Sequence, residues 1–363
     1  MGNIEKHVVP WLKDAKFYTL ADVDVAWAHP ERARMFVNEC PFPPSEKVVE
    51  AVTKAARIAN RYSGSCKDLK AKIGKIYNLG AENVCLGNGS SEFIDAVMRV
   101  FVEPGQEVIF PNPAFSMYAV RISVAGGKPV EVPLTADMDI DVDTMISKIT
   151  DKTKLIMICS PHNPSGKFMP EEDILKVFKT GLPVFMDEAY MEFTEGHQSM
   201  AKYIKEYPNV MCFHTLSKAY GLAGIRFGYM LADPKIVNIF NHVVLTWNNS
   251  QMNLAAAEAA LDDVESLKKR TKHNNDTVKF VVDEMSKIKG VKPYMSHGNY
   301  ILVDASDTGH TADEICSYVM ENKYHIKPMK PHLGKKGIFR ITPGTKAEND
   351  GLVETLKTFF SKS

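Results

Sequence analysis

Two charged residues lie at the ends of apolar runs of the sequence or just beyond them, at positions where they could take part in covalent and acid–base chemistry. Lys218 follows the apolar run 210–214, in a segment that also carries hydroxyls, glycines and Arg226. This pattern suits a lysine that forms a Schiff base with a carbonyl compound beside an arginine that binds an anion. Asp187 ends the apolar run 182–187 and is followed by Tyr190. Because an isolated buried carboxylate is unfavourable, we expect Asp187 to meet a cation or several hydrogen-bond donors.

Three further segments present polar groups in the same way. Residues 87–92 read Gly-Asn-Gly-Ser-Ser-Glu before an amphipathic stretch. Free N–H groups at a helix start, with the hydroxyls of Ser90 and Ser91, could bind a phosphate, although an ordinary capped turn is commoner. Asn163 lies in Ser-Pro-His-Asn-Pro-Ser-Gly, where turn chemistry alone could explain the pattern. Arg340 lies in a strand-like run near the C-terminus, and by itself it decides nothing.

The segments that must position these residues alternate regularly from residue 46 onward. Short, nearly continuous apolar runs are separated by amphipathic stretches, as expected for a sheet covered on both faces. The pattern predicts an α/β fold with an open, mostly parallel sheet, whose ligands bind beyond the carboxyl ends of the strands. The expected strands are 83–86, 107–110, 129–132, 154–159, 182–187, 210–214 and 227–231.

The pattern changes after about residue 245. The alanine-rich segment 254–261 opens a helical region reaching about residue 289, and strand-like runs follow at 300–303, 325–327 and 337–341. We therefore expect a second, smaller α+β domain. The predicted organisation is an N-terminal arm, 1–45, that joins the small domain, a large domain, 46–245, and the small domain, 246–363.

Composition and charge exclude several classes of function. The 363 residues carry 44 Lys+Arg and 44 Asp+Glu, so bulk electrostatics offers no attraction to nucleic acid or an anionic membrane. No apolar stretch approaches the roughly 20 residues of a membrane span, and the first ten residues are unlike a signal peptide. The six cysteines form no C-x-x-C pair, which argues against zinc and disulfides. We expect a cytoplasmic protein without a metal site.

Taken in order, the motifs resemble a known family. The glycine-serine turn, S-P-x-N-P-x-G, D-E-A-Y and T-L-S-K-x-x-G-L-A-G-x-R occur at the separations found in fold-type-I pyridoxal-phosphate aminotransferases. The resemblance covers nearly the whole chain from residue 35. It is strongest to the histidinol-phosphate aminotransferase branch, through residues 86–92, 215–229 and 340–350.

The resemblance implies roles for the residues that match its motifs. Lys218 would bond to the aldehyde of pyridoxal 5'-phosphate and later transfer a proton, and Asp187 would pair with the pyridine nitrogen. Asn163 and Tyr190 would hydrogen-bond the phenolic oxygen of the cofactor. The residues expected around the cofactor phosphate are Gly89, Ser90, Ser91, Thr215, Ser217 and Arg226.

Further residues follow from the same likeness. Phe115 would stack on the cofactor ring, and Tyr62 would reach the cofactor phosphate of a neighbouring subunit, which implies a homodimer. Arg340, with Asn163 and Lys327, would bind the substrate. The acceptor would be a keto acid such as 2-oxoglutarate. Weaker candidates for substrate contact are Trp11, Tyr18, His162 and Trp247.

The chain departs from the branch in two places. Its opening segment, 8–11, lacks the usual tyrosine-bearing motif, and Lys327 or Lys330 stands where the branch uses a second arginine for the substrate phosphate. Arg340 could bind a phosphate or an α-carboxylate, since both suit its planar donors. The leading interpretation is an aminotransferase acting on histidinol phosphate or a related aromatic or phosphorylated amino acid. The alternatives are a decarboxylase of the threonine-phosphate type and a cofactor-binding regulator, for whose extra DNA-binding domain we expect no room before residue 35.

Overall fold

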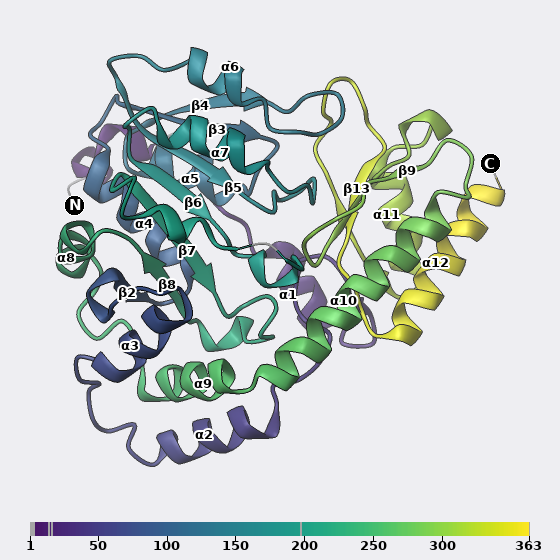
Figure 1. The fold of residues 1–363 in the computed structure, drawn as a ribbon. Coiled ribbons are helices and arrows are strands. Elements are labelled where there is room, and N and C mark those ends of the chain that lie inside the picture. The colour runs from purple at the N-terminus through teal and green to yellow at the C-terminus, as the bar shows by residue number, and fades with distance from the viewer. Residues whose placement is uncertain (1–3, 14, 16, 197, 363) are drawn as a thin grey trace.

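The computed structural model describes residues 4–13, 15, 17–196 and 198–362. Within these ranges seven strands form one large sheet, in the order β2-β8-β7-β6-β5-β3-β4, and a smaller sheet lies to its side (Figure 1). The strands of the large sheet are β2 (Val84–Gly87), β3 (Glu107–Asn112), β4 (Lys128–Pro133), β5 (Thr153–Cys159), β6 (Val184–Asp187), β7 (Val210–Thr215) and β8 (Gly228–Leu231).

Strand direction in the large sheet confirms the predicted α/β fold. Strands β4, β3, β5, β6 and β7 pair in parallel. Strand β8 is antiparallel to both of its neighbours, β7 and β2. Strand β2 therefore runs in the same direction as β7, and the carboxyl ends of β2, β5, β6 and β7 all lie along one edge.

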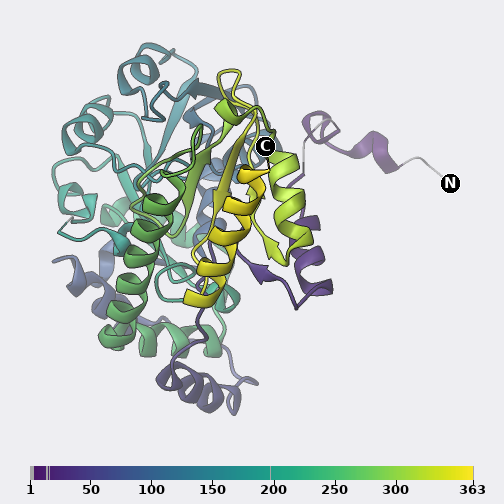
Figure 2. The same cartoon turned by 90° about the vertical axis from the view of Figure 1, so that its right-hand side faces the viewer.

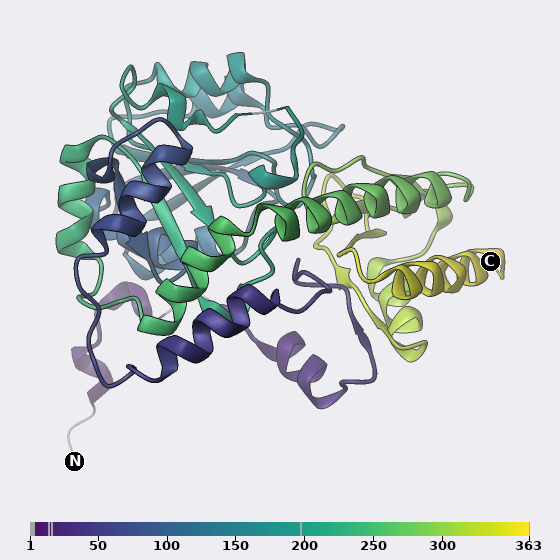
Figure 3. The same ribbon diagram turned by 60° about the horizontal axis from the view of Figure 1, so that its bottom comes forward.

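Helices cover both faces of this sheet, and each face has its own apolar core. Alternate residues of β5 face opposite sides: Ile156 and Ile158 pack in one core, Leu155 and Met157 in the other. On the first face α2 lies outside α9 (Figure 3). Helices on the first face are α2 (Glu46–Ala56), α3 (Lys67–Ile76), α6 (Val142–Ser147), α7 (Glu171–Phe178) and α9 (Gln251–Asp262), and those on the second are α4 (Ser90–Phe101), α5 (Met117–Val124) and α8 (Pro234–Val243).

The smaller sheet is antiparallel, in the order β12-β13-β10-β9. Its helices pack on one face around a separate apolar core, with α12 between α10 and α11 (Figure 2). The elements are α10 (Val264–Met285), β9 (Lys292–Pro293), β10 (Ile301–Asp304), α11 (Ala312–Glu321), β12 (Lys327–Pro328), β13 (Ile338–Ile341) and α12 (Lys346–Ser361).

The N-terminal segment contributes to this smaller part. After α1 (Ala21–Ala28), strand β1 (Ala33–Arg34) pairs in parallel with β11 (Tyr324–His325). Met35, which follows β1, is buried in the core beneath α11 and α12. In the described part of the chain, no helix is both long and apolar enough to cross a membrane.

One local prediction was wrong, and another was incomplete. The helical region expected from 254 to about 289 is present, but it consists of two helices, because Asp263 has a non-helical backbone (φ −93°, ψ 60°) between α9 and α10. The strand expected at 325–327 is two short strands in different sheets, since β11 pairs with β1 and β12 pairs with β13. Helix α9 packs in the core of the large sheet although it follows residue 245. The division into domains remains a prediction.

Candidate active site

The polar segments singled out in the sequence meet at one edge of the large sheet. Gly89 follows β2, Asn163 follows β5, Asp187 ends β6 and Thr215 ends β7. Since these four strands run in the same direction, the residues that follow them lie at the same edge. This edge is where ligands of open parallel sheets bind.

Asp187 is buried at the end of β6 and is held by two hydrogen-bond donors. The Tyr118 hydroxyl donates to Oδ2, and the backbone N–H of Ala189 donates to Oδ1 over 3.0 Å. Burial raises the pKa of the Asp187 carboxyl, and the hydrogen bond from Tyr118 opposes that rise. Asp187 thus meets the donors expected for a buried carboxylate, and its remaining lone pairs can accept from a protonated ring nitrogen.

Lys218 lies on the loop after β7, with its amine in the interior of the site. Nζ donates to the backbone oxygen of Val37 over 3.3 Å and lies 5.9 Å from the centroid of the Tyr190 ring. Burial, assisted by the positive charge of Arg340, lowers the pKa of Lys218 to about 8. A substantial fraction of this amine is therefore neutral near physiological pH, as a nucleophile requires.

Arg340, Asn163 and Tyr190 form one chain of hydrogen bonds across the two sheets. Arg340 Nη1 donates to Asn163 Oδ1 over 2.7 Å, and Asn163 Nδ2 donates to the Tyr190 hydroxyl over 3.4 Å. That hydroxyl also accepts from Asn38 Nδ2 over 2.9 Å, so its own proton remains available for a further acceptor. Arg340 Nη2 donates to the backbone oxygen of Phe36, whereas the buried Nε has no partner among the described residues.

The start of α4 lies against Arg226. Ser90 and Ser91 open the helix, and its N-cap residue, Gly89, offers no side-chain cap for the first N–H groups. Gly89 has φ +72°, and a Cβ built on it would lie only 2.4 Å from Arg226 Nη2. The glycine therefore lets the guanidinium approach a helix N-terminus, which produces a site for an anion.

Hydroxyls from the end of β7 and from the loop after it complete this anion site. Arg226 Nη1 lies 3.4 Å from Ser217 Oγ, and Thr215 Oγ1 lies 2.9 Å from the same oxygen. Ser217 and Thr215 are buried. A guanidinium, two hydroxyls and the free N–H groups of α4 together suit a phosphate group.

Phe115 lies beside the carboxylate end of the site. Its ring contacts Tyr118 edge to face, with centroids 5.9 Å apart, and Tyr118 is the donor to Asp187. The ring of Tyr18 also contacts Phe115 edge to face, with centroids 6.3 Å apart. An apolar ring next to a buried carboxylate suits a flat heterocycle whose nitrogen faces the carboxylate.

Among the described residues, the side chains of three predicted residues form no hydrogen bond or ion pair with the residues of this cluster. Tyr62 is 75% exposed and stacks on Trp247, with ring centroids 4.2 Å apart. Lys327 lies opposite Arg340 in the smaller sheet, where its amine pairs with Asp22. The weaker candidate His162 is buried, and burial lowers its pKa to about 3.

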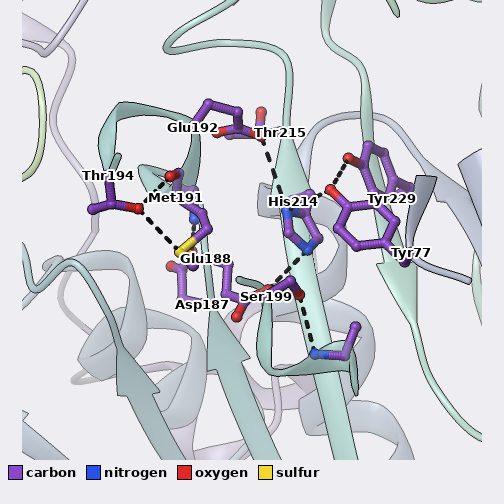
Figure 4. A network of polar contacts seen from close by, with 12 residues as sticks. Tyr77, Asp187, Glu188, Met191, Glu192, Thr194, Ser199, His214, Thr215 and Tyr229 are labelled. Atoms are coloured by element: carbon purple, nitrogen blue, oxygen red, sulfur yellow. Dashed lines mark hydrogen bonds and ion pairs between the residues drawn. The ribbon is translucent and has the colours of Figure 1, made fainter. Parts of the chain in front are cut away.

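A second buried network braces the strands that carry the site (Figure 4). His214 Nε2 lies 2.9 Å from Glu188 Oε2, and the same carboxylate accepts from the Ser199 hydroxyl and the backbone N–H of Met200. Although burial works against the charged imidazole, the hydrogen bond to Glu188 raises the pKa of His214. Because Glu188 follows Asp187 and His214 precedes Thr215, this pair fixes the ends of β6 and β7 relative to each other.

Tyr118, Asn38, Glu188 and His214 were not predicted from the sequence as site residues. Tyr118 follows Phe115 by three residues at the start of α5, which could have indicated that the two rings lie together. Glu188 and His214 directly flank predicted residues. Asn38 comes from the N-terminal segment, and the sequence carries no signal that it meets Tyr190.

The residues present fit pyridoxal 5'-phosphate. The anion site at α4 suits its phosphate, Asp187 suits its ring nitrogen, and the Tyr190 hydroxyl has a proton to donate to its phenolic oxygen. The Lys218 amine lies near the Tyr190 ring, and the charges of Arg226 and Asp187 both act on its pKa, so it belongs to the same site.

Comparisons with known proteins agree with this arrangement. The model of the family "Aminotransferase class I and II" matches residues 34–356. A histidinol-phosphate aminotransferase of Thermoanaerobacter sp. (strain X514) is 34% identical over 335 residues, which cover 90% of this chain and 93% of the relative. The histidinol-phosphate aminotransferase of Sinorhizobium meliloti, solved in complex with pyridoxal 5'-phosphate, superposes with a TM-score of 0.88 at 26% identity, covering 98% of this chain and 97% of that one.

The decarboxylase considered as an alternative is more distant. The L-threonine-O-3-phosphate decarboxylase of Porphyromonas gingivalis superposes with a TM-score of 0.77 at 18% identity, over 91% of this chain and 99% of that one. That likeness shows a shared fold alone. With a family model matched over most of its length and a relative at 34% identity, the chain belongs to the class I and II aminotransferases.

Proposed function

We propose that the chain is a pyridoxal-phosphate-dependent aminotransferase that moves an amino group from histidinol phosphate, or from a related aromatic or phosphorylated amino acid, to 2-oxoglutarate. The observation that carries the proposal is the meeting of Lys218, Asp187 and the Arg340–Asn163–Tyr190 chain at one sheet edge. The names of the relatives support the choice of donor.

Asp187, Lys218 and Arg340 each have a separate role in the proposed reaction. When bound, the cofactor supplies an aldehyde that bonds to amines and a ring that accepts electrons. Asp187 would accept a hydrogen bond from the protonated ring nitrogen. Lys218 Nζ would take up the proton that leaves the substrate carbon bearing the amine, and would later return it. Arg340 would bind the anionic group of the substrate through Nε, which has no partner among the described residues, and would orient that carbon toward Lys218.

A panel of amino donors tests this function. The cofactor-loaded enzyme is mixed with each donor and 2-oxoglutarate while the cofactor absorbance, glutamate and carbon dioxide are followed. Glutamate formed in proportion to consumed donor is the expected result. Carbon dioxide without glutamate would instead support the decarboxylase.

The pH dependence of cofactor uptake should report on Lys218. Only the neutral amine attacks an aldehyde, and Lys218 loses its proton at about pH 8 instead of 10.5 because of burial and the charge of Arg340. The rate at which the cofactor-free chain takes up pyridoxal phosphate should therefore rise with pH through about 8 and level off above it. Stopped-flow absorbance measures this rate.

Two charge variants, one a test and the other a control, show whether Arg340 sets the midpoint of that pH profile. Arg340→Gln removes a positive charge that lowers the Lys218 pKa, so the midpoint should move to higher pH. Arg99→Gln removes an exposed charge of α4 and should leave the midpoint in place. A midpoint close to 10 in the unaltered chain would contradict the role given to the environment of Lys218.

Gly89→Ala should weaken cofactor binding about tenfold or more, because the new Cβ would displace the Arg226 guanidinium from a phosphate contact. Gly105→Ala is a matched control, since Gly105 also has positive φ but a Cβ there meets nothing within 4 Å. Both variants should lose stability to backbone strain, roughly 1 kcal/mol each. Equal cofactor dissociation constants for the two, measured by fluorescence titration, would exclude this role of Gly89.

We also propose that the active unit is a homodimer in which Tyr62 reaches the partner's cofactor phosphate. The stacked rings of Tyr62 and Trp247 are both largely exposed, as is Leu245, and exposed apolar side chains of this size are typical of interfaces. Sedimentation should give twice the 40.5 kDa chain mass. A monomer at working concentration would rule this out. Substrate contact by Lys327 and a cytoplasmic location likewise remain predictions.

A further inference from the structure

The anion-binding arginine has a second basic residue beside it. Lys327 and Arg340 are direct partners across the antiparallel pair β12–β13. Residues directly opposite in such a pair project from the same face of the sheet. Arg340 points from that face toward Asn163 of the large sheet. A substrate anion bound by Arg340 would therefore have Lys327 on the same face of the sheet.

A carboxylate from the N-terminal segment already neutralises this lysine. Lys327 Nζ forms an ion pair with Asp22 of α1, which lies 305 positions earlier in the chain. The chain just before α1 reaches the site as well, because Tyr18 contacts the ring of Phe115. The segment that carries Asp22 thus lies beside the substrate region, and its charge contributes to what that region binds.

The three charged side chains of this group sum to +1, since Arg340 and Lys327 are positive and Asp22 is negative. The nearby arginines Arg32 and Arg34 have their own partners, Glu31 and Glu39. An α-carboxylate carries one negative charge at neutral pH. A phosphate monoester, with a second pKa of about 6, carries nearly two and meets more repulsion from Asp22.

We propose that Asp22 is a specificity-determining residue: its negative charge disfavours a dianion at Arg340 more than a monoanion, and so shifts the preference of the enzyme from phosphate esters toward donors with an α-carboxylate. This inference rests on the proposed function, and among the donors left open there it selects amino acids. Asp22 acts through Lys327: when it holds that ammonium, only Arg340 is left to balance the charge of the substrate.

Anion binding to the cofactor-loaded enzyme tests the proposal without turnover. Dissociation constants of inorganic phosphate and acetate are measured by calorimetry at about pH 8 and constant ionic strength. Asp22→Asn should tighten phosphate about tenfold but acetate only about threefold, because the repulsion removed scales with the charge of the ligand. Asp24→Asn removes a charge from the exposed side of the same helix and should change neither constant.

The lysine provides an independent variant. Lys327→Gln leaves Asp22 unbalanced, so phosphate should bind more weakly than to the unaltered enzyme, and adding Lys327→Gln to Asp22→Asn should remove the gain. If Asp22→Asn fails to fold, the comparison of Lys327→Gln with the unaltered enzyme decides. The proposal is overturned if phosphate and acetate change by the same factor, if Asp24→Asn has the same effect, or if Lys327→Gln leaves phosphate binding unchanged.

Turnover separates this proposal from the proposed function. The ratio of kcat/KM for histidinol phosphate to that for an amino acid donor should rise about tenfold in Asp22→Asn. If no donor yields glutamate while the phosphate constants change as described, the aminotransferase proposal fails and the role of Asp22 stands. If glutamate forms and the ratio does not change, the role of Asp22 fails alone.

Discussion

Replacing Lys218 with alanine should lower kcat by at least about 10⁴-fold, since it removes both the covalent attachment point of the cofactor and the base that moves the proton. The visible absorbance of the cofactor–lysine bond should disappear as well. Stability should change little, because the amine that is removed has one hydrogen bond, to Val37, and a pKa that burial has already lowered. Initial rates, absorbance spectra and a thermal melt measure the three effects.

Lys218→Arg is the matched control for that variant. It retains a long, positively charged side chain but cannot bond to an aldehyde at neutral pH, so it should be as inactive as the alanine variant. Multiple turnovers at a rate within tenfold of the unaltered enzyme, by either variant, would remove Lys218 from the mechanism. Loss of activity accompanied by loss of the native melt would point to misfolding.

Asp187→Asn should lower kcat by about 10² to 10³-fold, the usual effect of removing a buried group that stabilises developing charge. The amide cannot keep a ring nitrogen protonated, although it can still accept from Tyr118 or from the backbone of Ala189. The affinity for pyridoxal phosphate should fall as well, because the charge pair with the ring is lost. Steady-state kinetics and cofactor titration measure the two effects.

Tyr118→Phe distinguishes the charge of Asp187 from its position. It removes the hydroxyl that donates to Asp187 and opposes the rise in its pKa, but leaves the carboxylate in place. Its effect on kcat should therefore be at least tenfold smaller than that of Asp187→Asn. Comparable losses in the two variants would show that the hydrogen-bonded pair acts as a unit, and near-normal activity of Asp187→Asn would contradict the role of the carboxylate.

Much of the fold and of the site can be predicted from local patterns in the sequence. Each strand of the large sheet is a short apolar run, and the residues that do chemistry lie at the ends of such runs or a few residues beyond them, as Asp187 and Lys218 do. Parallel strands bring the ends of these runs to one edge, so a local pattern predicts a cluster in space. The fold class and the family, inferred from these motifs, are confirmed by the match over residues 34–356.

The remainder depends on contacts between distant segments. The ion pair of Asp22 with Lys327 and the hydrogen bond of Asn38 to Tyr190 join residues 305 and 152 positions apart. No periodicity or motif marks such partners. The break at Asp263 and the change of sheet after His325 also depend on packing, since both segments have the apolar pattern of one continuous element.

The same limit applies to the choice of substrate. The sequence identifies Arg340 as an anion-binding residue, but the charge of its surroundings is known only once α1 is placed next to β12. The relatives are named for a phosphate ester donor, whereas the Asp22 carboxylate paired with Lys327 favours a donor with less negative charge. The paired measurements on Asp22 and Lys327 decide between them.

The central claim is that the strand-end cluster holds pyridoxal phosphate on Lys218. The most direct measurement is borohydride reduction of the cofactor-loaded enzyme, which traps the cofactor on its lysine, followed by proteolysis and mass spectrometry. We expect the phosphopyridoxyl group on the peptide that contains Lys218, in one copy per chain. The label on a different lysine, or its absence from every peptide, would contradict the account.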